Sequence, residues 1–189
     1  ANKNGGCTWT YVASRDFYKN NCAEGGVGQR ITVTSTQANG GTAITSKVSL
    51  ADARSKAEQI LDQKGQDYAN QHGTCVWTGT GSATFYKDNC GSCKQGVAIS
   101  VPYSSLGLDP ITSTVSQADA NNKVQEAFRS NSATRAAAQA YANKNGDCED
   151  TPPNWSGWSY DGGNYCSGGD VWARYRRTDS TGCHSDETE

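Results

Sequence analysis

Apolar residues recur at helical spacing between positions 49 and 73. Residues three or four positions apart lie on the same side of an α-helix, so this spacing predicts one amphipathic helix. Ser49 is a suitable N-cap, Asp52 adds negative charge to the first turn, and Gly73 is a typical terminator. The predicted apolar stripe consists of Leu50, Ala53, Ala57, Ile60, Leu61 and Tyr68.

Shorter segments before the helix have the pattern of β-strands. Residues 11–18 and 83–86 are rich in aromatic and β-prone residues, and residues 30–34 and 97–101 place their β-branched side chains on one face. Such runs are typical of strands in a sheet. Glycine-rich turns separate the two strands of each pair.

These elements occur twice, because the chain contains an internal repeat. The sequence Phe-Tyr-Lys-Asn-Asn-Cys at 17–22 returns 68 positions later at 85–90, with Asp88 as the one difference. Three matched blocks in the same order indicate tandem repeats. The other two blocks are residues 48–53 with 115–120, and residues 66–70 with 139–143.

The second helix is longer than the first. Its matched blocks begin at 115 and 139, 24 positions apart, whereas those of the first helix begin at 48 and 66, 18 positions apart. Six extra residues turn an α-helix by about 600°, which leaves its two ends about 240° out of phase. We therefore predict a break near residues 130–132, with Ser132 as the N-cap of a further helix.

The predicted fold class is α+β: two tandem β-β-α(-β) repeats that contain disulfides, and a small C-terminal all-β module. A proline-rich linker at 151–153 and a glycine- and aromatic-rich composition set the third segment apart. Residues 1–7 match the last seven residues of each repeat, so we interpret them as the tail end of a preceding repeat. Either the natural chain continues upstream or another chain completes that unit. The predicted boundaries are 8–75 for the first repeat, 76–148 for the second and 149–189 for the β-module.

Composition limits the classes of function. Only 34% of the residues are hydrophobic, which favours several small modules over one large core. The net charge is −2 with dispersed Lys and Arg, so we expect no nucleic-acid partner. No apolar run approaches the ~18 residues of a transmembrane helix, so we expect no membrane insertion. The chain has no Met, which is typical of a processed mature form or an excised fragment.

The chain has eight cysteines, an even number whose spacing follows the repeat. This usage favours an oxidising compartment. Cys90 and Cys93 form a C-x-x-C motif, but zinc or redox chemistry needs partner residues that the sequence does not show, so a structural disulfide is preferred. Pairing within modules gives Cys22–Cys75, Cys90–Cys148 and Cys166–Cys183, and leaves Cys7 and Cys93. Pairing of neighbours gives Cys7–Cys22, Cys75–Cys90 and Cys148–Cys166, and leaves Cys93 and Cys183.

Neither the histidines nor the acidic residues form a catalytic or metal-binding set. His72 and His184 are predicted surface residues, because one lies near a helix end and the other in the C-terminal tail. Asp147, Glu149 and Asp150 lack the spacing of a calcium loop, and we interpret them as a solvated junction. We therefore predict no catalytic residues, no cofactor, no metal and no enzyme activity.

Aromatic residues are concentrated in the C-terminal module. Exposed aromatic rings stack on sugars or anchor protein partners, whereas buried ones would form the core of so small a module. The sequence leaves both interpretations open. The candidate binding residues are Trp155, Trp158, Tyr160, Trp172 and Tyr175.

The order of the repeat motifs resembles a repeat of unknown function that is found in large secreted proteins of Bacteroidota. The motifs are Phe-x-Lys-Asn-x-Cys, a glycine-rich turn and strand, Ser-x-Ala-Asp-Ala, and Gln-x-Tyr-Ala-Asn-x-x-Gly-x-Cys, over roughly residues 15–75 and 83–148. The C-terminal segment is similar to a Trp/Cys-rich β-module common in those proteins. The resemblance implies secreted or surface localisation, tandem architecture and no enzyme activity. It also implies that each repeat is closed by its own two cysteines, which favours pairing within modules.

We therefore expect a non-enzymatic, extracellular structural segment of a bacterial surface protein, such as a stalk, an adhesin or a filament subunit. Its expected partners are other copies of itself or adjoining repeats of a longer chain. The alternative is a carbohydrate-binding module that uses the C-terminal aromatic residues on a surface polysaccharide. Ser180 lies in Asp-Ser-Thr, which resembles the short acceptor motif for O-glycosylation in Bacteroidota.

Overall fold

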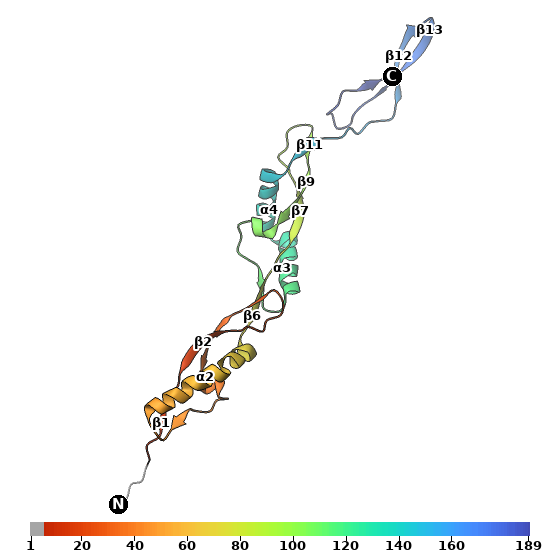
Figure 1. The fold of residues 1–189 in the computed structure, drawn as a ribbon. Helices are drawn as coiled ribbons and strands as arrows, with labels where there is room; N and C mark the ends of the chain where they lie inside the picture. The colour runs from red at the N-terminus through yellow and green to blue at the C-terminus, as the bar shows by residue number, and fades with distance from the viewer. Residues whose placement is uncertain (1–5) are drawn as a thin grey trace, which may run out of the picture. The chain divides into compact units, whose positions relative to one another are not determined.

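The computed structural model describes residues 6–189 and divides into two compact units (Figure 1). The first unit contains the residues up to 81 together with 109–126, and the second contains 82–108 together with 127–189. The fold class is α+β, as predicted. The units do not coincide with the sequence repeats, because residues 109–126 of the second repeat belong to the first unit.

In the first unit a long helix packs against short antiparallel strands. Its elements are β1 (Trp9–Thr10), β2 (Ser14–Tyr18), β3 (Gly26–Gly28), β4 (Arg30–Thr34), α1 (Ser35–Ala38), β5 (Thr45–Ser46), α2 (Leu50–His72), β6 (Cys75–Thr78), β10 (Thr112–Ser113) and most of α3 (Gln117–Ser130). Of the predicted tail at residues 1–7, residues 1–5 lie outside the described part of the chain. Strand β2 pairs with β4 from Ser14 opposite Thr34 to Tyr18 opposite Arg30.

The core of the first unit lies between α2 and the β2–β4 pair. Val33, Leu61 and Ala69 are fully or almost fully buried, and Phe17 packs against them. The predicted apolar stripe of α2 is buried at Ala53, Ala57 and Leu61. The stripe was wrong at Leu50, which is 52% exposed because it stands in the first helical turn, outside this cluster.

The repeated motif at residues 17–22 and 85–90 is attached to a helix in the same way in both units. The side-chain amide of Gln66 donates to the carbonyl of Tyr18 (2.9 Å), and that of Gln139 donates to the carbonyl of Tyr86 (2.7 Å). Both contacts join the end of a strand to a distant helical residue, 48 positions away in the first unit and 53 in the second. The repeated motif is therefore a structural attachment of strand to helix.

The second unit repeats this arrangement and adds the C-terminal module. Its elements are β7 (Ser82–Tyr86), β8 (Lys94–Gly96), β9 (Ala98–Pro102), the 3-10 helix η1 (Tyr103–Ser105), the end of α3, α4 (Ser132–Asn145), β11 (Cys148–Asp150), β12 (Ser159–Ser167), β13 (Asp170–Arg177) and β14 (Glu187–Thr188). Strand β7 pairs with β9, and Phe128 contacts both Phe85 and Tyr103 (ring centroids 6.2 and 5.9 Å). The aromatic contacts take the place of the Leu61 packing in the first unit.

The second repeat has two helices where the first has one. Helix α3 ends at Ser130 and α4 begins at Ser132, so the predicted break is confirmed. The predicted cap was wrong, because the N-cap is Asn131: its side-chain oxygen accepts from the amide of Thr134 (3.0 Å). Ser132 is already helical, so it cannot supply the extended backbone of an N-cap.

Candidate functional site

The two sequence repeats share one strand. Strand β6, which closes the first repeat, lies between β3 of the first repeat and β10 of the second, in the order β10-β6-β3. Cys75 lies opposite Gly28, and Trp77 lies opposite both Gly26 and Ser113. We call this three-stranded sheet with its side chains the Trp77 joint. Because one strand pairs on both edges, neither repeat can lose it without breaking hydrogen bonds to the other.

Trp77 is the centre of the Trp77 joint. Its side chain is 8% exposed and its indole nitrogen donates to the carbonyl of Glu24 (3.3 Å). Cys75 and Ala120 are the buried residues beside it. The indole lies so close to Gly26 that a Cβ added there would be 2.8 Å from Trp77 Cε2. Glycine at this position therefore makes room for the ring.

The helix start of the second repeat closes the other side of the joint. The side-chain amide of Gln117 donates to the carbonyl of Thr78 (2.7 Å), and Asn121 Oδ1 accepts from the amide of Thr80 (2.9 Å). These contacts and the burial of Ala120 explain why the start of α3 belongs to the first compact unit.

The equivalent junction after the second repeat is polar. Strand β11 pairs with β8, so that Cys148 lies opposite Gly96 and Asp150 lies opposite Lys94. Asp150 stands where the first repeat has Trp77, and its carboxylate accepts from Lys94 at 3.1 Å. We call this pair of strands the Asp150 junction. The Asp150 side chain is 84% exposed, so no apolar contact replaces the indole.

Three disulfides are present in the described residues: Cys22–Cys75, Cys90–Cys148 and Cys93–Cys183. The first two are the pairs that the within-module scheme predicts, with Cα atoms 5.7 and 5.9 Å apart. Each ties the end of a repeat to the loop after its first long strand. Disulfides of this kind are typical of an oxidising, extracellular environment.

The predicted pair Cys166–Cys183 was wrong. Cys183 pairs with Cys93, which both pairing schemes had left without a partner, and Cys166 is exposed and unpaired. Cys166 lies opposite Val171 near the turn of the β12–β13 hairpin, whereas Cys183 follows the base of that hairpin. Nearness in sequence did not bring the two sulfurs together, because the length of the hairpin separates them.

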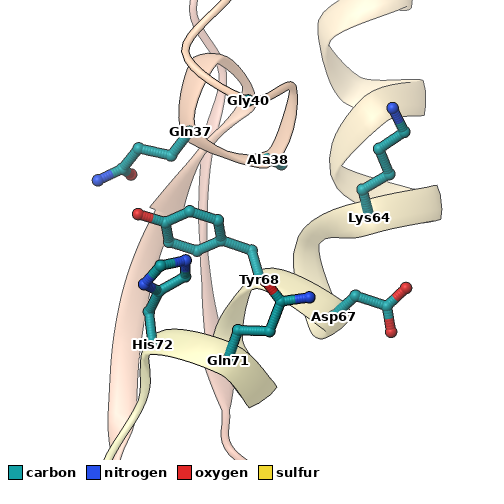
Figure 2. Close-up of a pocket in the computed structure, with 8 residues that line it drawn as sticks. All are labelled: Gln37, Ala38, Gly40, Lys64, Asp67, Tyr68, Gln71 and His72. Atoms are coloured by element: carbon teal, nitrogen blue, oxygen red, sulfur yellow. The ribbon is translucent and has the colours of Figure 1, made fainter.

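A shallow pocket of about 400 Å³ lies between α1 and the end of α2 (Figure 2). In Figure 2 the rings of Tyr68 and His72 lie against each other, with ring centroids 4.1 Å apart. His72 is exposed, as predicted, and both rings are on one helix face, since they are four residues apart. The lining residues are Gln37, Ala38, Gly40, Lys64, Asp67, Tyr68, Gln71 and His72. The second repeat has Asn145 where the first has His72, so this stacked pair is not a feature of the repeat.

No group of three or more His, Cys, Asp or Glu side chains is placed to hold a metal ion within residues 6–189. None of the helices in that range is long and apolar enough to span a membrane.

A model of a protein family of unknown function, DUF5977, matches the chain twice, at residues 10–76 and 78–149. The chain belongs to the DUF5977 family. A search of curated proteins and a search of solved structures each gave no match. The two family segments are tandem and meet within β6, so the Trp77 joint is the contact between two DUF5977 repeats.

The C-terminal module lies outside the two DUF5977 segments. Its predicted aromatic cluster does not form one surface. Tyr160 lies opposite Tyr175 on one face of the β12–β13 ribbon (ring centroids 6.0 Å), and Trp172 points to the other face because it is an odd number of residues from Tyr175. Trp158, Tyr160, Trp172 and Tyr175 are between 41% and 53% exposed, so these four do not form a buried core either.

Trp155 and Trp158 of the predicted set hold an arginine between them and Glu187. The guanidinium of Arg177 lies 4.7 Å from the ring centroid of Trp155 and 4.7 Å from that of Trp158. Arg177 also forms an ion pair with Glu187 on β14. Because the guanidinium occupies the space between the two indoles, these rings are not free to stack on a ligand there.

The loop that carries Cys183 is organised by a buried carboxylate. Asp179 is 7% exposed and accepts from the amides of Asn154 (2.8 Å) and Thr181 (3.0 Å). Burial by itself raises the pKa of Asp179, but hydrogen bonds from Thr181, Asn154 and His184 outweigh burial and hold the pKa well below its ordinary value. The ionised Asp179 therefore fixes the turn between the hairpin and the Cys93–Cys183 disulfide.

The hydroxyl of Ser180, the predicted glycosylation site, lies at the surface of this loop. It accepts from the side-chain amide of Asn154 (2.7 Å) and donates to the carbonyl of the same residue (3.1 Å). Ser180 is exposed, so an attached sugar would face solvent, and attachment would break its hydrogen bond to the Asn154 carbonyl.

Proposed function

We propose that this chain is a non-enzymatic, structural segment of a secreted or cell-surface protein of a Bacteroidota bacterium, of the stalk, adhesin or filament kind. Strand β6 carries this proposal, because it belongs to the sheets of two consecutive DUF5977 repeats at once. A shared strand makes each repeat part of its neighbour, as in other repeat arrays in which adjacent units bury each other's surface. The expected partners are adjoining repeats.

The disulfides support a role in resisting extension. Cys22–Cys75 bridges a sequence separation of 53 residues, and Cys93–Cys183 bridges one of 90. A pulling force applied at the two chain ends passes through these bridges and bypasses the residues between them. At about 3.6 Å per residue, the bypassed segments correspond to roughly 190 Å and 320 Å of extended chain.

Single-molecule stretching of the chain between end-attached handles tests this role. The maximum extension of the oxidised chain is expected to be shorter than that of the reduced chain by about the sum of the two lengths given above. Equal extension with and without a reducing agent would contradict a spacer function that relies on the disulfides. The variant Cys166→Ser serves as the control, because Cys166 is unpaired and its loss should leave the extension unchanged.

The exposure of Trp172 supports a second candidate, binding of a surface polysaccharide. Tyr165 lies opposite Trp172 on the same face of the ribbon, so two rings are available there. A titration with polysaccharides followed by tryptophan fluorescence is expected to saturate, and Trp172→Ala should abolish the signal if this face binds. The absence of a response from every polysaccharide tested would remove this candidate.

The proposal of O-glycosylation at Ser180 is tested separately by mass spectrometry of the natural protein. An added sugar mass on the peptide that contains Ser180, lost in Ser180→Ala, is expected. An unmodified peptide from the natural source would contradict it.

A further inference from the structure

The edge strand at the start of the described chain has the same design as the shared strand β6. Cys7 and Trp9 occupy the positions of Cys75 and Trp77, 68 residues earlier. Trp9 pairs with Ser46 of β5, just as Trp77 pairs with Ser113 of β10. In β6, the opposite edge is paired with β3. Among residues 6–189, no strand pairs with that edge of β1.

The side chains of this edge are more exposed than their counterparts in the Trp77 joint. Cys7 is exposed and unpaired, whereas Cys75 is buried and bonded to Cys22. Trp9 is half-buried, whereas Trp77 is buried. Leu50 takes the position of Gln117 in the repeat and is 52% exposed, although the helical pattern of the sequence assigns it to an apolar face. We call Cys7, Trp9 and Leu50 the N-terminal face.

We infer that the N-terminal face binds the Gly-x-Gly strand and the preceding cysteine of a further DUF5977 repeat, in the way that β6 binds residues 22–28. This inference rests on the proposed function and names its partner. Trp9 would be covered by the first glycine of that strand, as Gly26 covers Trp77. Leu50 would contact the turn before the strand, because Gln117 lies against Gly25 of that turn in the Trp77 joint.

The chemistry of the joint includes a disulfide between Cys7 and the cysteine of the partner repeat. The two thiols lose two protons and two electrons as the S–S bond forms. An oxidised disulfide such as glutathione disulfide accepts them and is reduced to two thiols.

The partner is a repeat other than the two in this chain. The strand Gly26–Gly28 is already paired with β6, and Cys22 is already bonded to Cys75. The corresponding strand β8 is paired with β11, and it has Lys94 where a glycine is needed beside an indole. A second folded copy of this chain therefore offers no free strand of the required kind. The N-terminal face fits a repeat with Gly at the position of Gly26 and with no closing strand of its own.

The test adds one repeat to the full chain. A copy of residues 8–68 is joined directly before Ala1, so that residues 1–7 continue the added copy as residues 69–75 continue the first repeat. After refolding in a glutathione redox buffer, disulfide mapping is expected to show Cys7 bonded to the added copy's Cys22. Iodoacetamide is expected to label Cys7 in the unextended chain and to leave it unlabelled in the extended chain.

Two variants of the extended chain show whether the joint has the inferred geometry. Gly26→Lys in the added copy alone copies the residue found in β8, and we expect it to lower the equilibrium constant for closing the Cys7 disulfide by about tenfold, because a side chain would meet the Trp9 ring. Combining it with Trp9→Asp, which copies Asp150, is expected to restore closure. Equal closure in all three chains would overturn the inference of an indole covered by glycine.

Three further results would overturn the inference. The first is a Cys7 that remains reactive in the extended chain. An added copy that stays unfolded would also count against the inference, because the N-terminal face is inferred to supply the strand that this copy lacks. Cys7 could pair with Cys166. The unextended chain could form Cys7-linked dimers that bury Trp9, which would make a second copy the partner. Stretching the unextended Cys7→Ser variant tests the proposed spacer function without any Cys7 disulfide, so a failure here is distinguishable from a failure of that function.

Discussion

At the Trp77 joint and the Asp150 junction, the closing strand of a repeat pairs in the same register with an earlier strand of that repeat, but the side chains have opposite chemistry. Trp77 faces Gly26 in the first, and Asp150 faces Lys94 in the second. The indole is 8% exposed and is covered from both repeats, whereas the carboxylate is 84% exposed. An apolar ring is stabilising only where a following repeat covers it, and a charged side chain suits a position that faces solvent. The residue two positions after the closing cysteine therefore indicates whether a joint continues the array.

The disulfides at the two sites are expected to give the largest effects. Replacing both cysteines of Cys22–Cys75 or of Cys90–Cys148 with alanine should cost about 4 kcal/mol from loop closure at either site. At the Trp77 joint we expect a further loss of about 1 kcal/mol, because Cys75 packs beside Trp77 and Ala120. Urea unfolding that is monitored separately through the NMR signals of α2 and of α4 measures the loss of stability at each disulfide. A larger loss at the Asp150 junction would contradict the comparison.

Removing the contrasting side chains should separate the two sites most clearly. Trp77→Ala is expected to destabilise the first unit by about 3–5 kcal/mol, because it leaves a cavity beside buried residues. Asp150→Ala removes one exposed ion pair and should change the stability of the second unit by at most about 1 kcal/mol. The same urea experiment compares them, and similar losses for the two variants would show that the Trp77 joint is not a packed interface.

Gly26 and Trp77 should behave as a coupled pair. Gly26→Ala places a Cβ against the indole and is expected to cost about 1–3 kcal/mol. In the Trp77→Ala background the same change should cost less than about 1 kcal/mol, since the ring is gone. Lys94→Ala at the Asp150 junction is the matched control, with an expected effect below about 1 kcal/mol. Equal costs of Gly26→Ala in both backgrounds would rule out the inferred contact.

A pH dependence is expected at the end of the second unit, outside both the Trp77 joint and the Asp150 junction. Because the pKa of folded Asp179 lies below that of the unfolded chain, about 3.9, its ionised form stabilises the fold. This contribution should be complete above about pH 5 and should be lost as the pH falls through the lowered pKa. NMR signals of Trp155 and Cys183 recorded from pH 6 downward measure it. Asp179→Asn should remove this acid step, and an unchanged step in that variant would assign it to another group.

The sequence predicted those parts of the fold that rest on local pattern or on the repeat. The helix break near 130–132 followed from the phase of an inserted segment, and the two disulfides of the repeats followed from the resemblance. The cap was assigned to Ser132 because the pattern alone does not distinguish it from Asn131, whose side chain reaches Thr134. The prediction of a Cys166–Cys183 pair was wrong because the C-terminal module occurs once, so no internal copy restricts the pairing of its cysteines.

The strand Gly26–Gly28, which pairs with β6, was missed for a physical reason. Two of its three residues are glycines, which are depleted in strands, and only Val27 is β-branched; the space beside Gly26 is filled by the indole of Trp77. A signal was nevertheless present in the two repeats. Gly26 and Trp77 change together to Lys94 and Asp150, as residues in contact would.

Amide hydrogen exchange tests the shared strand most directly. Successive amides of a strand point to opposite edges, so a strand paired on both edges protects neighbouring amides and a strand paired on one edge protects alternate ones. We predict slow exchange at both Val76 and Trp77 of β6, and slow exchange at only one of Glu149 and Asp150 of β11. Fast exchange at either Val76 or Trp77 in the oxidised, folded protein would contradict a strand shared by two repeats.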